Sequence, residues 1–176
     1  IFMQAEKKNR NGRIYPRDIL EQAVEKYSSE QVSAGRAVGE LGHPSSPTVN
    51  LDRVSHRITE LSWNGNDVMG KAQVLETPMG QIVRGLMEGE VQLGVSTRGM
   101  GSLSERGGNT YVKDDFILST VDIVQDPSAP EAFVDGIMEN VEWYIDNGIL
   151  KAETAEGIQK TIKATPSVRL EEQQIK

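Results

Sequence analysis

The sequence centres on the stretch Gly94-Val95-Ser96-Thr97-Arg98-Gly99-Met100. β-Branched residues flank the serine, which favours a β-strand, and the glycines let another chain segment approach closely. Side chains alternate between the two faces of a strand, so Ser96 and Arg98 should point the same way. A hydroxyl and a cation on one face suit acyl transfer, as nucleophile and anion stabiliser. The alternative interpretation of Ser96 is an ordinary strand serine.

A serine nucleophile needs a base, which is usually histidine, and the chain contains only two histidines. His43 lies among the glycines and prolines of residues 38–52, and Pro44 biases its backbone toward an extended conformation. A loop shaped in this way suits a functional site, and a surface histidine is the alternative. His56 lies in a strand-like run and is interpreted as an ordinary strand residue.

A candidate partner for the histidine is Asp122, which lies inside the apolar run 117–124. A buried carboxylate is costly unless it is paired, and a histidine would pair with it and be oriented by it. The alternative places Asp122 on the solvated face of an edge strand. Asp126 is a weaker candidate, because Asp-Pro is a common turn pair.

Composition limits the classes of function. The 176 residues have a formal net charge of −7 and a pI of about 4.9, which argues against nucleic acid or an anionic membrane as the main partner. The absence of cysteine excludes disulfides, thiolate nucleophiles and Cys-based metal sites. No apolar run approaches the roughly 18 residues of a transmembrane helix. We expect no metal and no cofactor, and we interpret the chain as an intracellular piece of a longer or processed protein.

Periodicity predicts strands mixed with helices. Strands are predicted over 1–3, 54–63, 67–75, the Ser96 stretch, 111–112 and 116–124, with Asn64-Gly65-Asn66 as a hairpin turn. Helices are predicted over 16–30, 78–90 and from the capping box at Ser128 to Asn147-Gly148, with 151–163 as a weaker candidate. This order favours an α+β, mainly β fold, in which helices pack outside an antiparallel sheet or barrel. We expect one domain over 1–150, followed by a helical segment and a loose tail over 151–176.

Three groups of residues occur together in a characteristic order. They are Gly39-Glu40-Leu41-Gly42-His43-Pro44, then Gly94-Val95-Ser96-Thr97-Arg98-Gly99, then Val121-Asp122 with Pro127-Ser128-Ala129-Pro130. Together they resemble the prohead (capsid maturation) serine proteases of tailed bacteriophages, and the segments Ile1-Phe2-Met3-Gln4-Ala5-Glu6, Asn9-Arg10-Asn11 and Tyr15-Pro16 resemble the myovirus type. The similarity covers roughly residues 1–135.

The resemblance implies a fold like that of herpesvirus assembly proteases, a small antiparallel β-barrel surrounded by helices. It implies a serine endopeptidase with Ser96 as nucleophile and His43 as base, and we assign the third role to Asp122. Arg98 is expected to meet a substrate glutamate or to support the oxyanion, and a structural or solvent-facing arginine is the alternative. The implied substrates are phage scaffold and capsid proteins, cut inside the immature head in the host cytoplasm by an enzyme made as a zymogen.

The resemblance also implies a cleavage pattern, in which the cut follows a Glu that has Leu or Ile two residues earlier. The chain contains this pattern itself at Leu170-Glu171-Glu172, Leu86-Met87-Glu88, Leu103-Ser104-Glu105 and Ile137-Met138-Glu139. The tail match is the best candidate for self-cleavage, because a protease needs an extended segment. The rival function is a non-catalytic scaffold or interaction protein of the phage prohead, against which the presence of all three polar residues argues. Neither reading calls for nucleic acid or membrane, and both leave room for a homo-oligomer.

Overall fold

The computed structural model describes residues 1–44, 46–129, 131–132, 134, 137–138, 141–146 and 149–154. It divides into two compact units, residues 1–84 with 93–133 and residues 85–92 with 134–176, and each unit is described by itself. The domain limits expected from the sequence, 1–150 and 151–176, stay a prediction.

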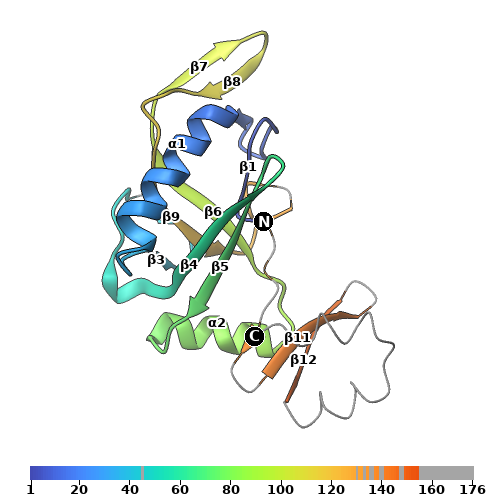
Figure 1. Ribbon diagram of the computed structural model, residues 1–176. Coiled ribbons are helices and arrows are strands. Elements are labelled where there is room, and N and C mark those ends of the chain that lie inside the picture. Colours follow the sequence, from blue (N-terminus) through green and yellow to red (C-terminus); the bar gives the residue numbers. More distant parts are fainter. Residues whose placement is uncertain are drawn as a thin grey trace. The chain divides into compact units, whose positions relative to one another are not determined.

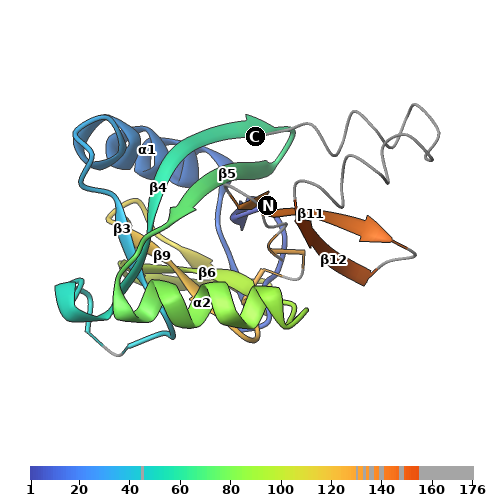
Figure 2. The same ribbon diagram turned by 90° about the horizontal axis from the view of Figure 1, so that it is seen from below.

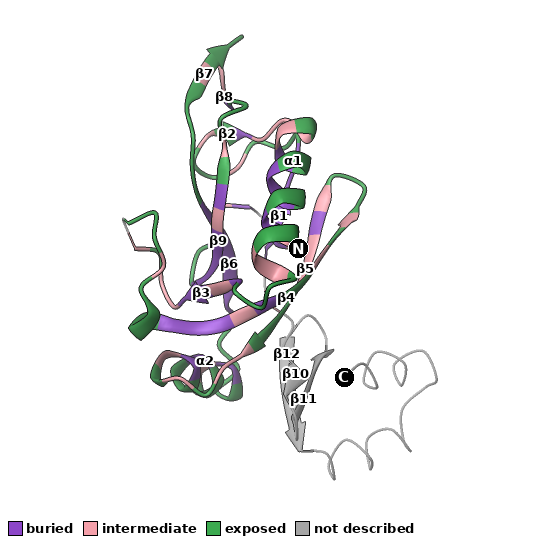
Figure 3. Ribbon diagram, turned by 60° about the vertical axis from the view of Figure 1, so that its left-hand side comes forward, coloured by how far each residue is buried: buried purple, intermediate pink, exposed green. Residues whose placement is uncertain are grey.

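The first unit consists mainly of β-strands (Figure 1). One sheet has the order β1 (Met3–Gln4), β5 (Asp67–Val74), β4 (Val54–Asn64) and β3 (Val38–Glu40). A second sheet pairs β6 (Gly94–Met100) with β9 (Ile117–Val124), and a third has the order β2 (Arg13–Ile14), β8 (Asn109–Val112) and β7 (Leu103–Arg106). Every pair is antiparallel except β2 with β8. Figure 3 shows β6 and β9 as largely buried and β7 as largely exposed.

The helices are short. They are α1 (Arg17–Tyr27), the π-helical turn η1 (Ser28–Val32), the 3-10 turn η2 (Leu51–Arg53) and α2 (Pro78–Glu88). The helix predicted over 16–30 is confirmed as α1, and its buried residues are Leu20, Ala23, Val24 and Tyr27. The Tyr27 hydroxyl lies 3.5 Å from Thr120 Oγ1, which places the end of α1 against β9. The helix predicted over 78–90 is also confirmed.

The strand β3 connects the four-stranded sheet to the β6–β9 pair. Thr120 Oγ1 donates to the carbonyl of Val38 at 2.7 Å, and the N–H of Gly42 donates to the carbonyl of Ile123 at 2.8 Å. Leu41 adds an isolated parallel bridge to Ile123. The strands of this unit thereby curl into a half-barrel (Figure 2). The predicted mainly β class is confirmed, and the likeness to herpesvirus assembly proteases stays a prediction.

His56 is a strand residue, as predicted, and it also ties β4 to β9. Its Nε2 lies 2.8 Å from the carbonyl oxygen of Val121, and its Nδ1 lies 2.9 Å from Ser55 Oγ. Gly39 makes room for the ring, because a Cβ at that position would lie 2.4 Å from Nε2. Burial lowers the pKa of His56 below its ordinary value, although the Val121 hydrogen bond and the Asp122 charge act in the opposite direction. The imidazole is therefore a neutral structural link.

The helix predicted from Ser128 to Asn147 is wrong. In the second unit β10 (Ile137–Met138), β11 (Val141–Asp146) and β12 (Ile149–Thr154) form an antiparallel sheet. The sequence of β11 is rich in β-branched and aromatic residues, and Asn-Gly favours a hairpin as readily as a helix end. The candidate helix at 151–163 begins as a strand up to Thr154. Its remainder and the predicted loose tail lie outside the described residues.

Candidate functional site

The candidate site is built on the β6–β9 pair. Ser96 lies directly opposite Asp122 in the antiparallel register, and Arg98 lies opposite Thr120. Opposed residues of such a pair share a face, with Cβ atoms about 4.5–5.5 Å apart. Ser96, Arg98 and Asp122 are all buried. The shared face expected for Ser96 and Arg98 is confirmed, and it includes Asp122.

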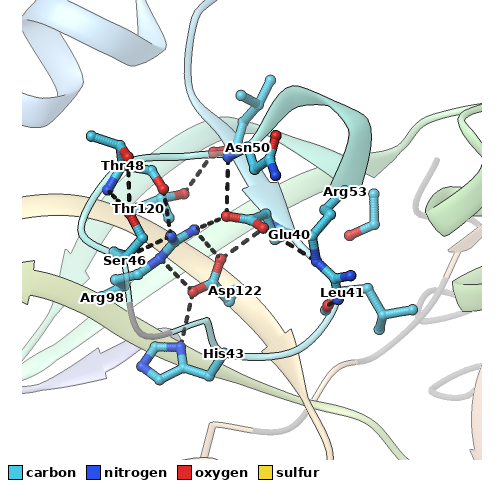
Figure 4. Close-up of polar contacts among 12 residues, drawn as sticks. Glu40, Leu41, His43, Ser46, Thr48, Asn50, Arg53, Arg98, Thr120 and Asp122 are labelled. Carbon is cyan, nitrogen blue, oxygen red and sulfur yellow. Dashed lines mark hydrogen bonds and ion pairs between the residues drawn. The ribbon is translucent and has the colours of Figure 1, made fainter.

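His43 reaches this face from the loop that follows β3. Gly42 has a φ of +85°, a conformation that favours glycine, and the chain turns there before His43. The Nδ1 atom of His43 lies 2.9 Å from Oδ2 of Asp122 (Figure 4). Because the ionised carboxylate can only accept, Nδ1 carries the proton and Nε2 is left as the acceptor. The histidine side chain is 42% exposed, so it can meet a ligand.

Asp122 has no exposed surface and is held by several donors. Arg98 donates to it through Nε at 2.9 Å and through Nη2 at 3.0 Å, and the N–H of Glu40 donates at 3.1 Å. Burial raises the pKa of Asp122, but the hydrogen bonds from His43, Arg98 and Glu40 outweigh it and hold the pKa below its ordinary value. Asp122 is thus a buried, paired carboxylate, and the alternative of a solvated edge position is wrong.

Arg98 uses all of its donors within the protein. Besides Asp122, it donates to Glu40 Oε2 at 2.6 Å, and its Nη1 donates to the carbonyls of Ser46 and Thr48 at 2.9 Å each. The five N–H groups of a guanidinium are then all occupied. A contact with a substrate glutamate would break one of these bonds. The substrate-binding role of Arg98 stays a prediction that this geometry does not favour, whereas the structural alternative fits it.

Glu40 is a member of the site that residue-by-residue reasoning did not single out. It is fully buried, and Oε2 accepts from Arg98 and, at 3.3 Å, from the N–H of Asn50. Oε1 lies 3.6 Å from Nε of Arg53, which is half-exposed. Glu40 and Asp122 therefore hold one guanidinium between two carboxylates, and that guanidinium fixes the loop that carries His43 (Figure 4). A carboxylate beside apolar residues in Val38-Gly39-Glu40-Leu41 was the available signal.

Ser96 contacts a second serine. Its Oγ lies 2.9 Å from Ser128 Oγ, and no hydrogen bond joins it to His43 among the described residues. Pro127 positions Ser128 by packing on Gly94, where a Cβ would lie 2.7 Å from the proline ring. Ser128, expected as a helix cap, thus lies beside the candidate nucleophile. The structure joins His43 to Asp122 directly and places Ser96 across the ladder from that carboxylate.

A groove of about 380 Å³ opens beside these residues. From the site it is lined by His43, Thr97, Arg98 and Ser128, and its other walls come from β2, the end of β6 and the β7–β8 hairpin. We call it the His43 groove.

Within the described ranges, no helix is long and apolar enough to cross a membrane. The same ranges contain no group of three or more His, Asp or Glu residues that could hold a metal ion.

The chain is similar to known proteins in sequence and in fold. The model of the family described as "Prohead core protein serine protease" matches residues 1–142. The "Prohead core protein protease" of Enterobacteria phage T4 is 44% identical over an alignment of 139 residues, and the match covers 76% of this chain and 65% of that protein. The solved structure of the bacteriophage T4 capsid assembly protease matches with a TM-score of 0.67 at 40% identity, covering 72% of this chain and 80% of the other.

Proposed function

The chain belongs to the prohead core protein serine protease family, and from this premise we propose that it is a serine endopeptidase that cleaves phage scaffold and capsid proteins inside the immature head. The match spans about 65% of the length of the T4 relative, so the activity is inferred for this chain. The observation that carries the proposal is the 2.9 Å contact between His43 Nδ1 and the buried Asp122 carboxylate, on the face that holds Ser96.

The proposed chemistry begins with a change of rotamer at Ser96. Its Oγ leaves Ser128 and turns toward Nε2 of His43, a rotation between staggered states about one bond. His43 takes the hydroxyl proton as Oγ attacks the peptide carbonyl, and it then gives this proton to the departing amine. Water, deprotonated by His43, hydrolyses the acyl-enzyme and restores Ser96. Asp122 stays ionised throughout and stabilises the imidazolium.

Within this proposal Arg98 and Glu40 are positioning residues. Arg98 holds Asp122 through two hydrogen bonds, and it holds the carbonyls of Ser46 and Thr48 in the loop of the base. Glu40 balances the charge of Arg98 from the opposite side. The carboxylate and the loop that present His43 are therefore fixed by one buried guanidinium.

The two neighbouring serines provide the direct test. The Ser96→Ala variant should lose cleavage of purified scaffold protein and labelling by a fluorophosphonate probe. The Ser128→Ala variant removes a hydroxyl 2.9 Å away and should still be labelled at position 96, as located by peptide mapping. Cleavage that persists in Ser96→Ala and vanishes in Ser128→Ala would transfer the role to Ser128. If neither the two variants nor the wild-type protein cleaves scaffold protein, the non-catalytic scaffold function would be favoured.

We also propose a cleavage specificity, in which the enzyme cuts after a glutamate that has Leu or Ile two positions before it. The proposal includes self-cleavage after Glu172, in a segment outside the described residues. Wild-type protein incubated alone should shorten to a chain ending at Glu172 by mass spectrometry. Ser96→Ala should stay intact, and Glu172→Gln should keep its tail while still cutting scaffold protein. Shortening of Ser96→Ala at the same rate would show that another protease makes the cut.

A further inference from the structure

The His43 groove differs in charge from the chain as a whole. The sequence has 26 Asp and Glu against 19 Lys and Arg, for a net charge of −7. No aspartate or glutamate lines the groove, whereas two arginines do. The charge of Arg98 is balanced by the buried carboxylates of Glu40 and Asp122, so the charge offered to a ligand is that of Arg13. A concave surface lined by charge of one sign attracts ligands of the opposite sign. The groove beside the candidate base therefore favours an anionic ligand on an otherwise acidic protein.

Of the two arginines, Arg13 is the one with open donors. All the N–H groups of Arg98 are already used in hydrogen bonds. The Arg13 side chain is exposed, and none of the described carboxylates lies within ion-pair distance of it. Its backbone is nevertheless fixed, because its N–H donates to Asn9 Oδ1 at 2.9 Å and β2 pairs with β8. The guanidinium is thus anchored at the groove and free to form a bidentate contact with a carboxylate.

The groove also contains apolar side chains that water reaches. Met100 is 47% exposed and Leu103 is 45% exposed, and both line it. Tyr15 and Phe116 add an edge-to-face pair with centroids 5.3 Å apart. Gly99 keeps this arrangement possible, because a Cβ there would lie 2.6 Å from the Phe116 ring. An extended peptide places alternate side chains on one face, about 6.6 Å apart, so one face can present an apolar and an acidic side chain together.

We propose that Arg13 binds a carboxylate side chain of a peptide in the His43 groove, while Met100 and Leu103 contact an apolar side chain of the same peptide. Arg13 is then a specificity-determining residue, in the place that sequence reasoning gave to Arg98. The consequence for cleavage rests on the proposed protease function. The binding itself needs neither Ser96 nor turnover.

A binding experiment tests the assignment without catalysis. The probe is a fluorescein-labelled peptide Ala-Leu-Ala-Glu-Ala-Ala, with a twin in which Gln replaces Glu, titrated by anisotropy against the Ser96→Ala protein. We expect the Glu peptide to bind about tenfold or more tightly than its twin, and the difference to shrink with salt. Adding Arg13→Ala should remove the difference. Adding Arg10→Ala should not, because Arg10 is an exposed arginine outside the groove, paired with Asp126 at 3.9 Å.

A kinetic arm uses the full chain with Ser96 intact and the same two peptides as substrates. Arg13→Ala should lower kcat/KM for the Glu peptide by about 10- to 100-fold, the loss of one charge-assisted contact, and leave the Gln peptide unchanged. Arg13→Lys should recover part of the loss. Equal effects on both peptides, or equal effects of Arg13→Ala and Arg10→Ala, would overturn the assignment. Absence of cleavage by wild type, with selective binding retained, would overturn the protease function and leave the assignment standing.

Discussion

His43 Nδ1 lies 2.9 Å from Asp122 Oδ2, and the same carboxylate accepts two hydrogen bonds from Arg98. The group that orients the candidate base is therefore itself immobilised. Asp122 is fully buried while the His43 side chain is 42% exposed, so the carboxylate is shielded from solvent and the imidazole is accessible to a ligand. A carboxylate held in this way can keep the imidazole in one tautomer and stabilise its protonated form.

The first prediction concerns the charge of that carboxylate. Asp122→Asn keeps the shape but allows the wrong tautomer of His43, and kcat should fall by about 10³–10⁴-fold with less change in KM. Circular dichroism should show retained secondary structure. Asp126→Asn is the control, since Asp126 is exposed and only 3.9 Å from Arg10, and its kcat should stay at the wild-type value. An unchanged kcat in folded Asp122→Asn would show that the pair serves stability alone.

The second prediction separates a buried from a surface ion pair. Glu40 is fully buried against Arg98, and its replacement by Gln leaves that guanidinium short of one counter-charge. We expect Glu40→Gln to lower the free energy of unfolding by about 2–4 kcal/mol and to reduce cleavage, because the Asp122–Arg98 contact shifts. Glu60→Gln breaks an exposed pair with Lys71 and should cost about 1 kcal/mol or less. Urea unfolding of the two variants measures the difference, which would vanish if Arg98 re-pairs freely.

The pairing of His43 with Asp122 is the part of the site that the sequence predicts best. A carboxylate in the apolar run 117–124 is expected to be paired if it is buried, and only two histidines can be the one that pairs with it. The alternation of β6 also predicts that Ser96 and Arg98 share a face. Both inferences rest on local rules, the cost of burial and the period of a strand. The His43–Asp122 contact agrees with the first, and the register of β6 with β9 agrees with the second.

The rest of the site depends on contacts between distant segments. Nothing local shows that Glu40, 58 residues before Arg98, takes one of its donors, or that Ser128, 32 residues after Ser96, lies at its hydroxyl. The capping-box pattern at Ser128 predicted a helix, but the strand propensity of Val141–Asp146 and its pairing with Ile149–Thr154 override that pattern. These contacts and strands depend on pairing between distant segments, and the periodicity of a single sequence carries no information on such pairing.

The third prediction uses two glycines with similar geometry. Gly42 and Gly35 have φ of +85° and +68°, and a Cβ at either would meet no atom within 4 Å. Each substitution by Ala should therefore cost about 1–2 kcal/mol through backbone strain alone. Only Gly42 is directly adjacent to His43, so only Gly42→Ala should also lower kcat beyond what the loss of folded protein explains. Thermal melting gives the stability of both variants, and equal kcat values would refute the role of the turn in placing the base.

The fourth prediction concerns His56, whose pKa is lowered mainly by burial against the opposing effects of the Val121 hydrogen bond and the Asp122 charge. Because the folded pKa lies below the unfolded value of about 6.5, the unfolded chain takes up a proton that the folded chain does not as pH falls below that value. Wild-type stability should therefore decrease from pH 8 to pH 5, by at most about 1.4 kcal/mol per pH unit from this residue. His56→Gln retains a donor for the Val121 carbonyl but does not titrate. Its deficit relative to wild type should thus be largest at pH 8 and shrink toward pH 5 in urea unfolding. Asp122, whose pKa is lowered below the usual carboxylate range, does not titrate between pH 8 and pH 5. If the unfolding free energies of the two proteins changed with pH in parallel, His56 would be able to take up a proton in the folded protein, contrary to this prediction.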